Sequence, residues 1–155
     1  MGKILRITEA VSEVSRVRGV KVLVGGCFDI LHIGHITFLE KARRKGNYLI
    51  LLLESDQTIK KLKGDNRPVN NQTNRAELLS HLDLVDLVIL LPEMADQVYD
   101  SIIMELKPQV IATTLGDPGI KHKKRQANLV GAKLIAVTKR VKGFSSTNLI
   151  DLKSV

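Results

Sequence analysis

The sequence predicts an α/β protein built on one open, parallel β-sheet with helices covering both faces. Short apolar runs rich in Val, Ile and Leu alternate with longer amphipathic stretches, which is the pattern of strands joined by helical crossovers. The apolar runs are continuous, as is typical of strands buried on both faces of a parallel sheet. The 155 residues, of which 44% are hydrophobic, suffice for one domain with its own core.

The apolar runs predict five strands. They are residues 20–24, 48–53, 87–91, 109–113 and 133–137. Gly25 and Gly26 end the first run, and prolines flank the third and fourth, because both residue types interrupt regular structure. We therefore expect a five-stranded parallel sheet, doubly wound through right-handed crossovers.

Six helices are predicted between and around these strands. They are residues 8–17, 36–45, 74–82, 95–106, 121–130 and 145–152. Residues 55–72 form the one long connection without clear periodicity, and long loops in compact domains are commonly functional. We expect a single domain over residues 1–155, with a leading helix at 8–17 and a catalytic core at 20–152.

Composition and charge narrow the possible partners. The formal charge of +8 favours polyanionic partners such as nucleotides and sugar phosphates, whereas 3% aromatic residues disfavour binding of single-stranded nucleic acid by base stacking. Cys27 is the one cysteine, which excludes an intrachain disulfide and a Cys-based zinc cluster. Because the sequence shows neither a signal-peptide core nor an apolar run of roughly 20 residues, we expect a cytoplasmic protein.

The strongest functional motif joins the first strand to its helix and reads GGCFDILHIGH. Glycines at a strand end let backbone amides approach a phosphate. His32 and His35 are three residues apart, which puts both imidazoles on one helix face, and Gly34 leaves that face uncrowded. Such a pair suits the α and β phosphates of a nucleoside triphosphate. The alternatives are zinc, for which no third ligand stands at a plausible spacing, and a chance pair of surface histidines.

A second motif is cationic and lies in the long connection. Its cations are Lys60, Lys61, Lys63 and Arg67. Placed around Gly64, they form a segment able to close over phosphates, although a solvated charged loop is the simpler interpretation. Arg75 follows soon after, either as a phosphate contact or as a residue on a helix surface.

Two further motifs follow later strands. Three consecutive hydroxyls at residues 145–147, preceded by Lys139 and Arg140, indicate a phosphate cradle at a helix N-terminus, although one of them would suffice as an N-cap. Asp117, after the fourth strand, is placed to meet a base or ribose, although a turn explains it nearly as well. The basic run at residues 121–125 is interpreted as a helix surface rather than as a phosphate site.

Together these motifs resemble the cytidylyltransferase-like family of nucleotidyltransferases, and most closely the adenylyltransferase domain of bacterial ADP-heptose synthases. The family signature is a His-x-Gly-His turn with a late Ser-Ser/Thr-Thr segment. The subfamily typically reads NGCFDILHxGH, KGDxRPVN and SSTNII, which correspond here to residues 25–35, 63–70 and 145–150. The resemblance covers nearly the whole chain and implies a single Rossmann-like domain of the HUP class.

Carried over to this chain, the resemblance implies a site and a reaction. His32 and His35 hold the triphosphate and stabilise the transition state. Lys60 or Lys63 neutralises charge on the α phosphate or on the incoming phosphate. The nucleotide-binding residues we expect are Cys27, Phe28, Asp29, Gly34, Asp117, Arg140, Ser145, Ser146 and Thr147, and the candidates for the acceptor phosphate are Lys61, Arg67 and Arg75. The acceptor oxygen attacks the α phosphorus in line and pyrophosphate leaves, with Mg²⁺ held mainly by the triphosphate rather than by protein ligands.

The resemblance implies AMP transfer from ATP to a heptose 1-phosphate by a homodimer, without nucleic-acid or membrane partners. CTP and other acceptors stay open, because residues 114–116 differ from the usual Lys-Gly-Gly and because glycerol-3-phosphate cytidylyltransferase and archaeal FAD synthase share the motifs. A tRNA-binding module is a more distant alternative, because aminoacyl-tRNA synthetases also carry His-Ile-Gly-His. A catalytically silent nucleotide-binding regulator is the third.

Overall fold

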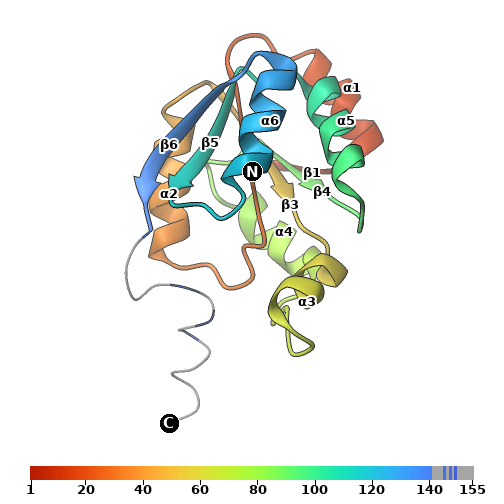
Figure 1. Ribbon diagram of the computed structural model, residues 1–155, viewed down its shortest axis with the longest axis vertical. Helices are drawn as coiled ribbons and strands as arrows, with labels where there is room; N and C mark the ends of the chain where they lie inside the picture. The colour runs from red at the N-terminus through yellow and green to blue at the C-terminus, as the bar shows by residue number, and fades with distance from the viewer. Residues whose placement is uncertain (141–144, 146, 148, 150–155) are drawn as a thin grey trace.

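The computed structural model describes residues 1–140, 145, 147 and 149, and it confirms the α/β fold class (Figure 1). Six parallel strands form one sheet in the order β1-β4-β3-β2-β5-β6. The strands are β1 (Lys3–Arg6), β2 (Lys21–Gly26), β3 (Tyr48–Leu53), β4 (Leu87–Leu90), β5 (Val110–Leu115) and β6 (Lys133–Lys139). The helices are α1 (Ile7–Ser15), α2 (Ile33–Arg43), α3 (Asp56–Lys63), α4 (Gln72–Ser80), α5 (Asp96–Leu106) and α6 (Ile120–Val130).

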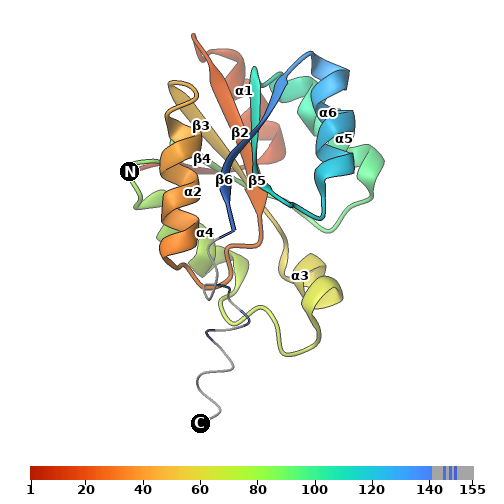
Figure 2. The ribbon, with the colours of Figure 1, turned by 60° about the vertical axis from the view of Figure 1, so that its left-hand side comes forward.

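Helices cover both faces of the sheet, with α2 and α4 on one face and α1, α5 and α6 on the other (Figure 2). Successive strand residues point to opposite faces, so each strand contributes to two buried clusters. Val22 and Val24 share a cluster with Phe38 of α2, whereas the intervening Leu23 shares one with Ile103 of α5. This burial on both faces is the physical reason why the strands read as continuous apolar runs.

The strand order reverses at β2, which pairs with β3 on one side and with β5 on the other. The chain first adds β3 and β4 outward from β2, and later adds β5 and β6 on the opposite side. In open α/β sheets, ligands bind beyond the carboxyl ends of the strands at such a reversal. The turns that follow β2 and β5 therefore lie at the edge of the sheet where a ligand site is expected.

The sheet has six strands, so the prediction of five is wrong. The additional strand is β1, which pairs with β4 at the edge of the sheet, with Lys3 opposite Leu87 and Arg6 opposite Leu90. It escaped the sequence criterion because it has four residues, two of them charged and exposed, and therefore shows no continuous apolar run.

The long connection also contains a helix, α3, that periodicity did not reveal. Ser55 caps it by accepting a hydrogen bond from the Thr58 amide at 3.1 Å. Ile59 is its one buried residue, so the helix has no apolar stripe to detect. Figures 1 and 2 show α3 beyond the carboxyl ends of the strands.

Near the termini, the leading helix is confirmed as α1, and the predicted closing helix at residues 145–152 lies mostly outside the described residues. Thr147 and Leu149 are helical in the part that is described. Within the described part of the chain, none of the helices has the length and apolar character needed to cross a membrane.

Arg75 of α4 has a fully buried side chain that ties together the segments leaving β2 and β3. Its guanidinium donates to the Cys27 carbonyl at 2.6 Å, to the Glu54 carbonyl at 2.9 Å and to the Asn70 carbonyl at 2.9 Å. It also bonds the Asp56 carboxylate at 2.7 Å, at the start of α3. Arg75 is thus not on the helix surface, and four of its five N–H donors are bound to protein oxygens rather than open to an acceptor phosphate.

We expect Arg75→Met to lower the free energy of unfolding by about 3 kcal/mol, because three carbonyls would lose their buried donors. Urea unfolding followed by circular dichroism measures the loss. Arg44→Met, at an exposed arginine, is the matched control and should change stability by no more than about 0.5 kcal/mol. A similar small effect of both substitutions would contradict a structural role for Arg75.

Candidate functional site

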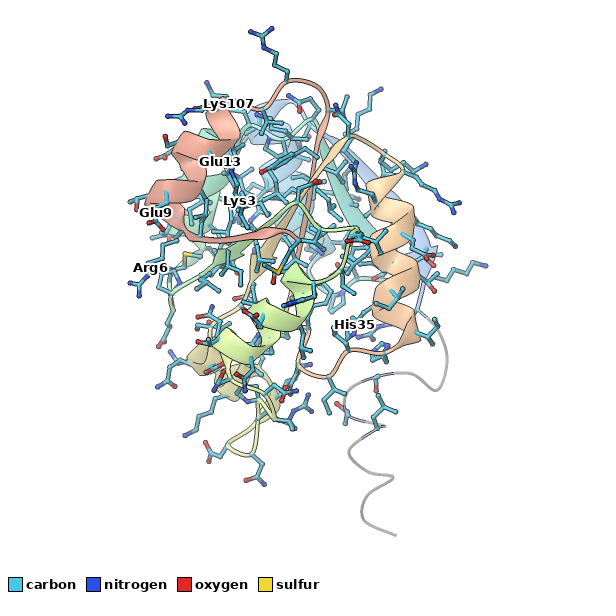
Figure 3. All side chains as sticks on the ribbon, turned by 180° about the vertical axis from the view of Figure 1, so that it is seen from behind. Lys3, Arg6, Glu9, Glu13, His35 and Lys107 are labelled. Carbon is cyan, nitrogen blue, oxygen red and sulfur yellow. The ribbon has the colours of Figure 1, made fainter. Side chains whose placement is uncertain are left out.

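The two histidines of the motif meet at the start of α2. His32 is the N-cap residue, and its Nδ1 accepts a hydrogen bond from the Gly34 amide at 3.1 Å. His35, one turn into the helix, stacks on His32 with ring centroids 3.8 Å apart and an interplanar angle of 23°. Figure 3 shows His35 at the end of α2 that lies at the carboxyl edge of the sheet. The predicted common face for both imidazoles is therefore present.

The turn before the histidines brings Phe28 against them. Phe28 adopts a left-handed backbone conformation, with φ of 46°, and its ring centroid lies 5.0 Å from that of His35. The ring also covers Gly26, where a Cβ would come within 2.9 Å of Phe28 Cε2. Glycine at this strand end is thus required by the close approach of an aromatic ring.

Both imidazoles are neutral near neutral pH. Burial lowers the pKa of His35 to about 4, assisted by the charges of His32 and Lys63 and opposed by the Ile30 backbone. Burial and, to a smaller extent, Lys63 also lower the pKa of His32. Because Nδ1 of His32 accepts a hydrogen bond, the proton of the neutral ring lies on Nε2.

Lys63 is the lysine of the cationic motif that reaches the pocket. It is the last residue of α3 and lines the same pocket as both histidines. Lys60 pairs with Asp65 at 3.6 Å and Lys61 pairs with Glu93, and neither lines the pocket. The structure thus singles out Lys63 from the three candidate lysines.

Asp29 does not line the pocket, contrary to the role expected for it at the nucleotide. Its carboxylate accepts hydrogen bonds from Arg67 Nε at 2.6 Å and from the amides of Val69 and Asn70 at 2.8 and 3.0 Å. Burial alone would raise the pKa of Asp29, but these hydrogen bonds and the Arg67 charge hold it below its ordinary value. Arg67 is likewise buried in this ion pair and away from the pocket, so both residues fix the loop after α3.

Cys27 lines the pocket, but its surroundings do not favour a nucleophilic thiolate. Burial raises the pKa of the Cys27 thiol, outweighing the opposing charge of Lys63. A neutral thiol is a poor nucleophile, so Cys27 contributes to the wall of the pocket.

The pocket has a volume of about 370 Å³ and opens between the carboxyl ends of β2, β5 and β6. Its lining residues are Gly25, Gly26, Cys27, Phe28, His32, Gly34, His35, Phe38, Lys63, Thr114, Asp117, Pro118, Lys123, Thr138, Lys139, Arg140 and Ser145. These include four cationic side chains and one carboxylate, which makes the pocket suited to an anionic ligand.

The other predicted site residues are only partly placed. Gly34, Asp117, Arg140 and Ser145 line the pocket. Thr147 is exposed, and Ser146 lies outside the described residues. Across the described residues, no group of three or more His, Cys, Asp or Glu side chains is arranged to hold a metal ion.

Phe38, Thr114, Pro118, Lys123 and Thr138 line the pocket but were not assigned to the site from the sequence, and Lys139 was named only as a residue preceding the hydroxyl motif. Phe38 lies on α2. The others come from β5, β6, α6 and the turn between β5 and α6, whose position beside β2 depends on strand order. The one available signal was their place at or just after predicted strand ends, where ligand contacts gather.

The low pKa of His35 makes stability depend on pH. The unfolded histidine binds a proton below about pH 6.5, whereas the folded protein resists protonation until about pH 4, so stability is full above pH 6.5 and falls as the pH drops through this window. Between about pH 7.5 and 5, His35 should account for a loss on the order of 2 kcal/mol. His35→Asn should remove that share in urea unfolding, whereas His81→Asn, at an exposed histidine, should not. Equal pH dependence in both variants would disprove the linkage.

Fold and site together define a nucleotide-binding α/β protein, with the ligand pocket at the strand-order reversal and a histidine-bearing helix N-terminus at its edge. The chain belongs to the cytidylyltransferase-like family, whose model matches residues 23–152. The predicted family is therefore confirmed.

Curated relatives agree with this assignment. The chain is 38% identical to the bifunctional protein HldE of Campylobacter fetus over 152 residues, which cover 96% of this chain and 31% of that protein. It is 43% identical to HldE of Aliarcobacter butzleri over 129 residues, which cover 83% of this chain and 26% of the relative. The chain thus spans less than a third of the length of these relatives.

Solved structures share the fold. A lipopolysaccharide core biosynthesis protein from Thermoplasma volcanium superposes with a TM-score of 0.64 at 26% identity, covering 80% of this chain and 98% of that one. A pantoate-β-alanine ligase from Francisella tularensis gives a TM-score of 0.64 at 15% identity, covering 99% and 77%, and shows the fold alone.

Proposed function

We propose that this chain is a nucleotidyltransferase domain that transfers AMP from ATP to a heptose 1-phosphate and releases pyrophosphate. The observation that carries the proposal is the stacked pair of His32 and His35, which lines a cationic pocket together with Lys63. The family and its HldE relatives, which are ADP-heptose synthases, support the class of reaction. The acceptor and the base are inferred from those relatives.

The chemistry follows from where charge moves. When an acceptor phosphate oxygen attacks the α phosphorus, negative charge develops on the phosphoryl oxygens and on the departing pyrophosphate. Neutral imidazoles at a helix N-terminus donate hydrogen bonds to those oxygens, and Lys63 adds a positive charge. An anionic acceptor needs no general base, so His32 and His35 act as donors rather than as proton acceptors.

We infer from the family resemblance that Mg²⁺ is held mainly by the triphosphate rather than by protein ligands. The ion would arrive on the triphosphate as part of the substrate. A cytoplasmic homodimer completes the proposal, on the basis of the family resemblance.

Replacing His35 with Ala should lower kcat for pyrophosphate release by about 10²- to 10³-fold, because it removes a donor to the transition state. His81→Ala, at an exposed histidine of α4's C-cap, is the control and should retain activity. If His35→Ala keeps activity within about threefold of the unchanged protein, His35 does not stabilise the transition state.

ATP with Mg²⁺ should raise the Tm more than CTP with Mg²⁺, because at equal concentration the ligand that binds the folded state more tightly stabilises it more. Pyrophosphate release should then require ATP and a heptose 1-phosphate, and should be weak with glycerol 3-phosphate. A larger rise in Tm with CTP than with ATP would contradict AMP transfer and favour CMP transfer. Tight triphosphate binding without turnover on any sugar phosphate would contradict the proposed activity.

A further inference from the structure

A polar network forms the wall of the pocket at the end of β5, on the opposite side of β2 from α3 and Lys63. Asp117 follows β5, and its Oδ2 accepts hydrogen bonds from Thr113 Oγ1 at 2.6 Å and from Lys123 Nζ. Lys123, on α6, also donates to Thr113 Oγ1 at 3.3 Å. Asp117 and Lys123 both line the pocket, with side chains 15% and 22% exposed.

The Asp117 carboxylate is occupied by the protein itself. Besides the two donors on Oδ2, the Gly119 amide donates to Oδ1 at 2.7 Å. Burial alone would raise the pKa of Asp117, but the hydrogen bonds from Lys123, Thr113 and Gly119 keep it low, so the group stays ionised. Asp117 therefore compensates the charge of Lys123 and orients its ammonium group.

Lys123 keeps one donor for a ligand. An ammonium group has three N–H donors, and among the described residues two of them are used, by Asp117 and Thr113. The ion pair with Asp117 carries no net charge, so it attracts a phosphate less than Lys63 does, which forms no ion pair with the residues that the structure describes. A neutral acceptor, such as a ring nitrogen or a carbonyl oxygen, suits this donor better.

We propose that Lys123 is a specificity-determining residue that donates a hydrogen bond to the base of the bound nucleotide, and that Asp117 and Thr113 are its positioning residues. The inference deepens the proposed function and depends on its triphosphate site. With the phosphates at His32, His35 and Lys63, the part of the lining on the other side of β2, in the turn after β5 and at Lys123, is left for the nucleoside.

The sequence departs from the usual pattern of the resembling subfamily at residues 114–116, directly before Asp117, and a basic run follows at residues 121–125. Lys123 points into the pocket, whereas Lys121 and Lys124 of that run are exposed. One lysine of an apparently uniform basic surface is thus distinguished by its contacts.

The test compares binding of ATP and of inorganic tripolyphosphate, each with Mg²⁺, by titration calorimetry. Lys123→Met should weaken ATP binding about tenfold or more and leave tripolyphosphate within about twofold. Lys121→Met is the matched control on the same helix and should change neither. Equal weakening of both ligands would place Lys123 at the phosphates, and unchanged ATP binding would remove it from the site. Either result overturns the proposal.

A second variant distinguishes two reasons why Lys123→Met would weaken ATP binding. One is the loss of the hydrogen bond from Lys123 to the base, and the other is an Asp117 carboxylate left without its cationic partner. The double substitution Asp117→Asn with Lys123→Met removes both charges and should bind ATP as weakly as Lys123→Met alone. Recovery of ATP binding in the double variant would overturn the proposal, because Lys123 would then only neutralise Asp117. A separate result would contradict the proposed nucleotidyltransferase function itself. In that case the unchanged protein would bind ATP and CTP no more tightly than it binds tripolyphosphate.

Discussion

The buried guanidinium of Arg75 is the contact on which the site's geometry depends. Parallel strands place their carboxyl ends at one edge, but the segments that leave them still need to be fixed. Arg75 binds carbonyls of the segments after β2 and β3 and of the loop before α4, together with the carboxylate that begins α3. Planar, multidentate donors allow one arginine to satisfy several acceptors that lysine would leave unpaired.

A second buried pair completes this arrangement. Asp29 and Arg67 join the turn after β2 to the loop after α3. The segment from Asp56 to Arg67 is therefore held at both ends, by Arg75 at Asp56 and by Asp29 at Arg67. Lys63 lies between these two anchors and reaches the pocket from α3. The charged motifs thus divide into residues that can meet a phosphate and residues that hold them in place.

The strands and motifs that depend on a local sequence pattern could be predicted from the sequence. Continuous apolar runs identified β2 to β6, and the spacing of His32 and His35 identified their common face. Predictions failed where tertiary contacts decide the outcome. The strand β1 and helix α3 bury too few apolar residues to show a period. The sequence does not show which charged residues are buried, because burial of a charge depends on its partners in the fold. For this reason ligand contacts were expected at Arg75, Arg67 and Asp29. Lys123 was not distinguished from its neighbours because it lies in a uniformly basic run.

The edge strand β1 has a consequence for how the chain assembles. It precedes β2 and β3 in the sequence, yet among the described residues it pairs with β4 alone, with Lys3 opposite Leu87. During synthesis β1 therefore lacks its pairing strand until β2, β3, β4 and the helices between them have emerged from the ribosome. Such a non-local pairing closes a long loop, and the entropy of closing it has to be lost before the contacts compensate for it. We therefore expect β1 to join the sheet after the strands in its middle have paired.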